Sequence, residues 1–273
     1  MAYRFLVLAL MLVGSFGCAA ARAAGDGDGA GAAGGISADS SLDQVLDALD
    51  RRGRDMKTLR ADVRLTDNDL AMGDKVARAG TFVLENKGDG SSRAHVLFKV
   101  KEEGDKGEKK TEEKIEYVLD GGKLIDRNYN KKTQNTQIVL APGEKMNLLK
   151  LGEGPFPLPI GQSKEEVHRA FDAKKIDAAK DDPAGTVHVQ LMPKPDTSLA
   201  RKFKLIDVWV NAKDEMPQRI TTLEPNETNE RVVELSNVKV NAPVSDADFQ
   251  LEKIDETMWT LHDSAYQDSG KKK

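Results

Sequence analysis

The sequence predicts a single α+β domain that is dominated by an antiparallel sheet. Segments with a two-residue apolar period follow one another along the chain without alternating with helices, which is typical of an antiparallel meander. One helix precedes this series, and a second short helix interrupts it. The last strand, within residues 232–251, carries the pattern of a bend, and bent strands belong to curved sheets that enclose cavities.

The opening helix is predicted by a capping box in which Ser40 stands three residues before Asp43. Apolar residues then follow at the spacing of one buried helical stripe: Leu42, Val45, Leu46 and Leu49. From residue 59 the apolar period changes to two, which predicts a strand with a common face for Leu59, Ala61, Val63 and Leu65.

Further strands are predicted where β-branched and aromatic residues lie between turn signals. They are Thr81–Glu85, Ala94–Val100, Ile115–Leu119, Lys123–Asp126, Gln137–Leu140, Thr186–Met192, Lys202–Val210, Gln218–Leu223 and Arg231–Val240. Asp120-Gly121-Gly122 is a hairpin turn, and the charged run 101–114 is expected to be a solvated connection. A second capping box, Ser163 with Glu166, predicts a short helix that bears Val167, Ala170 and Phe171.

The bend in the last strand is predicted from a change of phase. Val233 and Leu235 share one face of the strand, whereas beyond Asn237 the apolar positions are Val238 and Val240. A one-residue slip moves side chains to the opposite face, and a β-bulge restores them to the original one. We therefore expect a bulge at Asn237.

The N-terminus has the features of a secretory signal. Arg4 is followed by the apolar run Phe5–Val13, which is shorter than the roughly 20 residues that a membrane-spanning helix needs. Small residues at Ala21 and Ala23 fit a cleavage site. The expected organisation is a signal peptide at 1–23, a flexible Gly/Asp/Ala-rich linker at 24–38, one binding domain at 39–255 and a polar tail at 256–273.

Cys18 is the only cysteine of the chain, so a mature domain without it has no internal disulfide. This residue is a candidate for lipidation, as the first residue of a membrane-anchored bacterial lipoprotein. Gly17 fits that pattern, while Phe16 and Ser15 depart from it. The alternative is that Cys18 is removed with the signal. Either reading predicts a bacterial envelope protein, in the periplasm or anchored to a membrane.

Composition and motifs argue against several classes of function. The chain has 41 basic and 45 acidic residues, a net charge of -4, which argues against nucleic-acid binding. Its four histidines are scattered without metal-ligand spacing, and no phosphate loop or nucleophile motif is present. We therefore expect no enzyme activity, no catalytic residue, no cofactor and no metal.

Several short motifs together resemble a known family. They are Leu42-x-x-Val45-Leu46-x-x-Leu49, the strand 59–65, Gly80-Thr81-Phe82-Val83-Leu84, Asp120-Gly121-Gly122-Lys123-Leu124, and the closing stretch from Leu235 through Pro243 to Phe249. In these motifs and in the order of its elements, the chain resembles a divergent member of the periplasmic lipoprotein-carrier family, LolA and LolB and their relatives. The resemblance spans residues 40–253.

The resemblance implies a half-open antiparallel β-barrel of about ten to eleven strands that is closed by short helices. It implies an apolar cavity that takes up lipoprotein or lipid acyl chains and transfers them between membranes, without enzymatic activity or cofactor. The implied partners are an inner-membrane donor protein and an outer-membrane acceptor protein, and we expect a monomer. The alternatives are an envelope sensor of lipid or lipoprotein that regulates a partner, or an anchored acceptor.

Candidate site residues follow from this interpretation. Inward-facing positions are expected for Val63, Leu65, Phe82, Leu84, Val96, Phe98, Ile115, Tyr117, Phe203, Leu205, Trp209 and Phe249, although such residues also fill ordinary cores. The proline-rich segment 154–160 is expected to form a cavity lip, a partner edge or a packed loop through Phe156, Leu158 and Ile160. Arg93 is the candidate for the gating arginine of the family.

Overall fold

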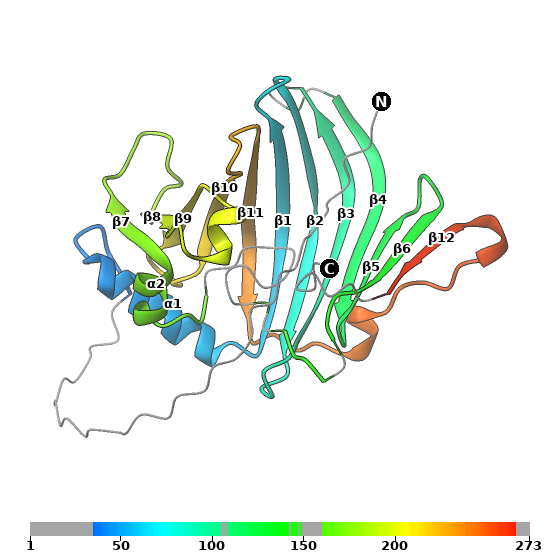
Figure 1. The fold of residues 1–273 in the computed structure, drawn as a ribbon, viewed down its shortest axis with the longest axis horizontal. Helices are drawn as coiled ribbons and strands as arrows, with labels where there is room; N and C mark the ends of the chain where they lie inside the picture. The colour runs from blue at the N-terminus through cyan, green and yellow to red at the C-terminus, as the bar shows by residue number, and fades with distance from the viewer. Residues whose placement is uncertain are drawn as a thin grey trace.

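The computed structural model describes residues 35–104, 107, 109–141, 143–146, 148 and 160–265. Within this part, twelve strands form one curved sheet in the order β12-β6-β5-β4-β3-β2-β1-β11-β10-β9-β8-β7 (Figure 1). The sheet is open, because its edge strands β12 and β7 do not pair. The predicted dominance of an antiparallel sheet is confirmed, but the described part is mostly β, and its sheet is not closed into a barrel and has more strands than expected.

The strands are β1 (Thr58–Asp69), β2 (Asp74–Asn86), β3 (Ser92–Glu103), β4 (Lys109–Asp120), β5 (Lys123–Asn128), β6 (Thr133–Ile138), β7 (Phe171–Ile176), β8 (Thr186–Pro193), β9 (Leu205–Asn211), β10 (Pro217–Leu223), β11 (Asn229–Val240) and β12 (Thr260–Ser264). The helices are α1 (Leu42–Asp55) and α2 (Lys164–Ala170), with 3-10 turns η1 (Ser198–Arg201), η2 (Asp246–Phe249) and η3 (Glu256–Met258). β12 pairs parallel with β6, and the other neighbours are antiparallel.

Helix α1 begins one residue later than its predicted capping box. The Ser41 hydroxyl accepts from the Gln44 backbone N–H, and the Gln44 side chain accepts from the Ser41 N–H. Ser40 instead accepts from the Ser37 N–H in the preceding turn. The glutamine at the third helical position completes the box, and Asp43 adds a negative charge to the first turn.

Helix α2 has the predicted capping box of Ser163 and Glu166 but ends sooner than expected. Phe171, expected within the helix, is the first residue of β7 and lies opposite Pro193 of β8. Pairing with β8 therefore overrides the helical pattern at this position.

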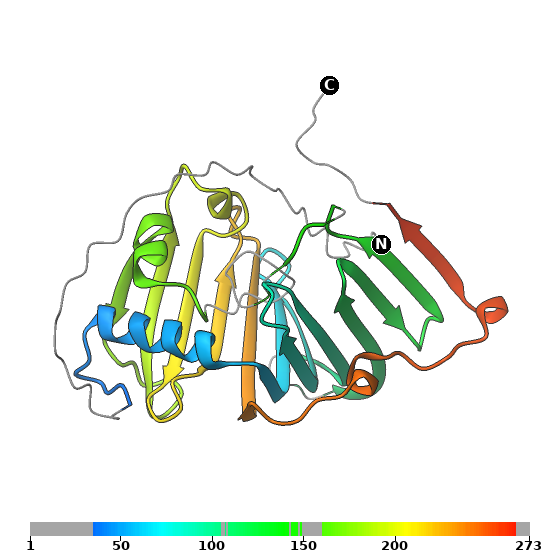
Figure 2. The same cartoon turned by 90° about the horizontal axis from the view of Figure 1, so that it is seen from below.

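We call the face of the sheet against which α1 packs the inner face, and the opposite one the outer face. Val45, Leu46 and Leu49 of α1 belong to one buried cluster with alternate residues of β1 to β5 and β8 to β11. Figure 2 shows α1 lying across β7 to β11 and leading directly into β1.

The predicted bulge at Asn237 is confirmed. Between Arg60 and Asp62 of β1 the register shifts, so that one β1 residue opposes both Asn237 and Val238. Asn237 adopts a left-handed φ of 50°, and its side-chain amide donates to Asp62 Oδ2 at 2.6 Å. Val238 packs against the core again. The extra residue thus restores the apolar face of β11, as the phase slip requires.

The segment from residue 243 to residue 259, which we call the strap, crosses the outer face from β11 toward β6 (Figure 1). The Asp248 carbonyl accepts from His95 Nδ1 at 2.7 Å, and the Glu252 carbonyl accepts from Arg127 Nη1 at 2.6 Å. After the strap the chain adds β12 to the sheet. This strand lies within the segment expected as a polar tail.

Candidate functional site

Three rows of side chains cross the inner face from β1 to β4, and we call them the apolar rows. They are Leu59–Leu84–Ala94–Leu119, Ala61–Phe82–Val96–Tyr117 and Val63–Gly80–Phe98–Ile115. Directly opposite residues on paired strands place their side chains on the same side of a sheet. Apart from Gly80 and the half-buried Tyr117, every member of the rows is buried. The inner face is therefore continuously apolar over four strands.

Gly80 permits a close approach of two strands within these rows. A Cβ added to Gly80 would stand 1.8 Å from the carbonyl oxygen of Leu97 on β3. The register of β2 against β3 also shifts between Ala79 and Gly80. Bulges strengthen the local bend of a strand, so this position contributes to the curvature of the sheet.

The cover over the apolar rows differs from that over the other half of the sheet. Among the described helices, α1 and α2 lie on the side of β7 to β11, and neither extends over β2 to β4 (Figure 2). Met146 and Leu148 are buried in the same cluster as the rows, and Ser92 donates its N–H to the Met146 carbonyl. Ile160 is fully buried, and the residue after it donates to the Leu49 carbonyl of α1. Residues outside the regular elements thus join the buried inner cluster near β3 and near α1.

Charged residues bound the rows at the end near the β1–β2 turn. Arg78 on β2 contacts Glu113 on β4 at 2.8 Å and Asp67 on β1 at 3.7 Å. Arg231 on β11 contacts the same Asp67 at 2.8 Å. These side chains are partly exposed, so their ion pairs add little stability and mainly mark the limit of the apolar surface.

Tyr117 and Asp126 mark the limit of the rows on the side of β5. The Tyr117 ring meets Phe98 edge-on at 6.2 Å between centroids, and Asp126 lies directly opposite Tyr117. Burial raises the pKa of the Tyr117 hydroxyl and also raises the pKa of the Asp126 carboxyl. The two groups therefore lie at a boundary between apolar and polar surroundings.

The structure brings most of the predicted inward residues together on this face. They are Val63, Leu65, Phe82, Leu84, Val96, Phe98, Ile115 and Tyr117. Leu59, Ala61, Ala94 and Leu119 complete the rows and were not among the predicted site residues, although Leu59 and Ala61 belong to the two-residue period of the same strand.

The inward assignment of Leu205 and Trp209 is wrong. The buried residues of β9 are Ile206, Val208 and Val210, so the odd-numbered positions lie on the outer face. There the Trp209 ring stacks on His188 at 4.2 Å between centroids, and its indole N–H donates to Asp182. Phe203 precedes β9 and packs, partly buried, against the core.

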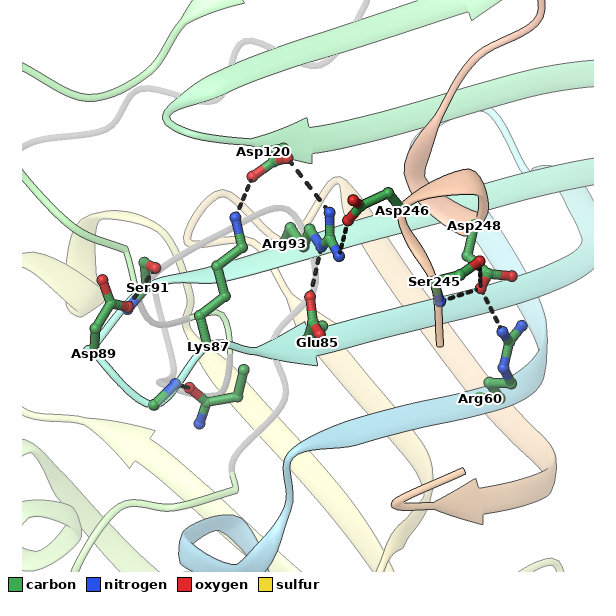
Figure 3. Close-up of polar contacts among 12 residues, drawn as sticks. Arg60, Glu85, Lys87, Asp89, Ser91, Arg93, Asp120, Ser245, Asp246 and Asp248 are labelled. Carbon is green, nitrogen blue, oxygen red and sulfur yellow. Dashed lines mark hydrogen bonds and ion pairs between the residues drawn. The ribbon is translucent and has the colours of Figure 1, made fainter. Parts of the chain in front are cut away.

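Arg93 lies on the outer face and does not border the apolar rows. Its guanidinium contacts Glu85 at 2.6 Å and Asp246 of η2 at 2.8 Å, with Asp120 at 3.9 Å (Figure 3). The guanidinium also lies 4.1 Å from the centroid of the Phe249 ring. Arg93 therefore fastens the strap to the sheet, which differs from the gate expected on the inner face.

Phe249 is buried on the outer face, beneath Arg93, and its inward assignment is also wrong. It belongs to the strap, which approaches the sheet from the side opposite α1. A neighbouring ion pair, between Arg60 and Asp248 at 2.7 Å, holds the same turn and lowers the pKa of the Asp248 carboxyl (Figure 3). Polar contacts thus surround the buried ring.

Three predicted site residues, Phe156, Leu158 and Cys18, lie outside the described residues. Ile160 is described and has no exposed surface, which is inconsistent with an exposed lip. Within the described ranges, no cluster of three or more histidine, cysteine, aspartate or glutamate residues could hold a metal ion. The helices of this part are too short or too polar to cross a membrane.

The fold was compared with those of known proteins. No model of a protein family and no curated protein sequence matches the chain. Among solved structures, it is similar to an uncharacterised conserved protein from Thermus thermophilus, with a TM-score of 0.43 and 8% identity over 81% of this chain and 98% of the other. It is similar to a LolA superfamily protein from Nitrosomonas europaea, with a TM-score of 0.31 and 10% identity over 78% and 98%. It is also similar to LprF from Mycobacterium bovis, with a TM-score of 0.37 and 14% identity over 74% and 94%.

Proposed function

We propose that this chain is an exported bacterial envelope protein that binds acyl chains of lipids or lipoproteins on the apolar rows and transfers them between membranes. The observation that carries the proposal is the continuous apolar face over β1 to β4, whose part on β2 to β4 the described helices do not cover. The secretory signal at 1–23 and the resemblance of the sequence to lipoprotein carriers support the same function.

The apolar rows offer enough surface for useful affinity. Paired strands lie about 4.8 Å apart, so four strands span roughly 15 Å of inner face. Burial of each methylene contributes about 0.8 kcal/mol, and six methylenes contribute about 5 kcal/mol before the cost of association. The rows are buried, so binding requires displacement of residues that pack with them, and Met146 and Leu148 belong to the same buried cluster. Loops exchange such contacts more readily than packed helices do, because fewer residues must move together.

The test begins with protein purified from bacterial envelopes. Native mass spectrometry followed by lipid extraction should recover bound acyl species, and the delipidated protein should take up a fluorescent fatty acyl probe. Absence of both would refute the proposal. Mass spectrometry of the mature N-terminus separates two forms of the function: a lipidated Cys18 indicates an anchored acceptor, and loss of residues 1–23 indicates a soluble shuttle.

A pair of substitutions localises the binding surface. Tyr117→Asn removes a half-buried ring at the margin of the rows, and Trp209→Asn removes an aromatic ring from the outer face. Tyr117→Asn should lose about 2 kcal/mol of apolar contact with the probe, which lowers the affinity roughly 30-fold. Trp209→Asn should leave the affinity for the probe unchanged. Circular dichroism checks that both variants are folded. Equal effects of the two substitutions would place the site elsewhere.

A further inference from the structure

The inner face changes its chemistry beyond the apolar rows. Tyr117 lies opposite Asp126 of β5, Asp126 lies opposite Asn135 of β6, and Asn135 lies opposite His262 of β12. The same face therefore continues across these strands with mostly hydrogen-bonding side chains, and Leu124 of β5 is a buried apolar exception. We call this surface the polar floor and define it by Asp126, Thr133, Asn135, Gln137, Thr260 and His262.

The side chains of the polar floor are available to a ligand. All six are half-buried or exposed. Within the described part of the chain, one side-chain hydrogen bond joins members of the floor, from Asn135 Nδ2 to Asp126 Oδ2 at a long 3.5 Å. The outer face of the same strands differs, because Arg127 there donates to Gln134 and to the Glu252 carbonyl. Arg127 and Gln134 on the outer face are thus satisfied within the protein, whereas most donors and acceptors of the floor have no side-chain hydrogen-bond partner among the described residues and are open to a ligand.

The composition of the floor selects a class of ligand. It contains hydroxyl, amide and imidazole groups and one carboxyl, Asp126. The cations that act on this carboxyl, Lys131 and Arg78, lie outside the floor. Arg78 is already paired with Glu113 and Asp67. Burial raises the pKa of Asp126, which shows that its surroundings disfavour negative charge. Neutral donors and acceptors that repeat about every 4.8 Å suit a ligand that carries many hydroxyl groups.

We infer that β5, β6 and β12 bind the uncharged, hydroxyl-rich head group of a lipid whose acyl chains lie on the apolar rows. The inference rests on the proposed function, since it deepens the same site by naming the head group. Continuity of the two surfaces supports it: the row that ends at Tyr117 continues directly into Asp126 and Asn135. It also gives β12 a role, because this strand supplies Thr260 and His262 to the floor.

The test uses amphiphiles with the same twelve-carbon chain and different heads: dodecyl maltoside, dodecylphosphocholine and dodecyl sulfate. Each is titrated below its micelle concentration against the full mature protein by calorimetry. Dodecyl maltoside should bind about tenfold more tightly than the other two. Asn135→Ala should weaken maltoside binding by about two- to tenfold, the value of one neutral hydrogen bond, and should leave the charged amphiphiles unchanged. Gln190→Ala, which removes an amide from the outer face, serves as the matched control and should change none of them.

The outcomes separate the inference from the function on which it rests. Similar affinities for the three amphiphiles, with no selective effect of Asn135→Ala, would overturn the head-group inference and leave acyl binding intact. Failure of every amphiphile to bind would overturn acyl binding itself. Tighter binding of dodecyl sulfate than of dodecyl maltoside would overturn the inference by showing that the floor prefers an anionic head.

Discussion

Replacing Gly80 with alanine tests whether β2 and β3 must approach each other as closely as the structure indicates. The new Cβ would stand 1.8 Å from the Leu97 carbonyl oxygen, 2.7 Å from the Leu97 carbonyl carbon and 2.8 Å from the Phe98 Cα. These are backbone atoms, so relief requires separating two paired strands. Overpacking in a core costs about 1–3 kcal/mol, and three such contacts place Gly80→Ala at about 3 kcal/mol or above.

Gly121→Ala is the matched control for this prediction. Gly121 has a φ of +57° in the hairpin turn, and an added Cβ there would meet nothing within 4 Å. Its substitution carries only the conformational cost of a left-handed alanine, about 1–2 kcal/mol. Urea denaturation followed by circular dichroism gives the free energy of unfolding of each variant. If Gly80→Ala costs no more than Gly121→Ala, the close approach of β2 and β3 is refuted.

Three further substitutions test other parts of the structure. Burial raises the pKa of Asp126, so the folded state binds a proton on this carboxyl more tightly than the unfolded state does, and the charged carboxylate opposes folding at neutral pH. Asp126→Asn should therefore raise the melting temperature at about pH 7. The gain should shrink as the pH falls toward about 4, where the carboxyl of the unfolded chain is also protonated. Asn241→Ala removes the side-chain oxygen that accepts from the Lys57 N–H and places alanine at a φ of 58°. This should lower the free energy of unfolding, measured by urea denaturation, by about 2 kcal/mol. Asn241→Gly should recover about half of that loss, because glycine adopts this φ without strain. Arg93→Met breaks the contacts with Asp246 and should increase proteolytic cleavage of the strap, with Lys87→Met as the control whose cleavage rate should not change.

Local pattern was sufficient to predict much of the apolar surface. The two-residue period placed Val63 on one face of β1, and the phase slip at Asn237 predicted a bulge that the β1–β11 register contains. Both predictions depend on residues within a single strand. The prediction for β9 assigned the odd-numbered positions to the inner face, which is the wrong phase. It gave more weight to the large rings of Phe203 and Trp209 than to the polar Asp207 between them. Asp207 shares the odd-numbered face, and its carboxylate would have argued for an exposed face there.

Features that depend on distant partners could not be read from the sequence. Phe249 is an apolar residue after a strand, and nothing near it indicates that the strap approaches the outer face. Phe171 continues a helical pattern locally, but its pairing with Pro193 makes it a strand residue. The polar floor is visible only after β5, β6 and β12 are placed in register, since its members come from separate strands.

The position of β1 within the sheet has a consequence for the order of folding. Strands β1 to β6 form one series of sequential hairpins and β7 to β11 form another, and each series consists of pairings between near neighbours in the chain. Among the described strands, one seam, β1 with β11, joins the two series and pairs residues as far apart as Leu59 and Val240. Closing so long a loop costs more entropy than forming a hairpin. We therefore expect the two series to form first and the seam, with its Asn237 bulge, to form last, which hydrogen exchange during refolding would resolve strand by strand.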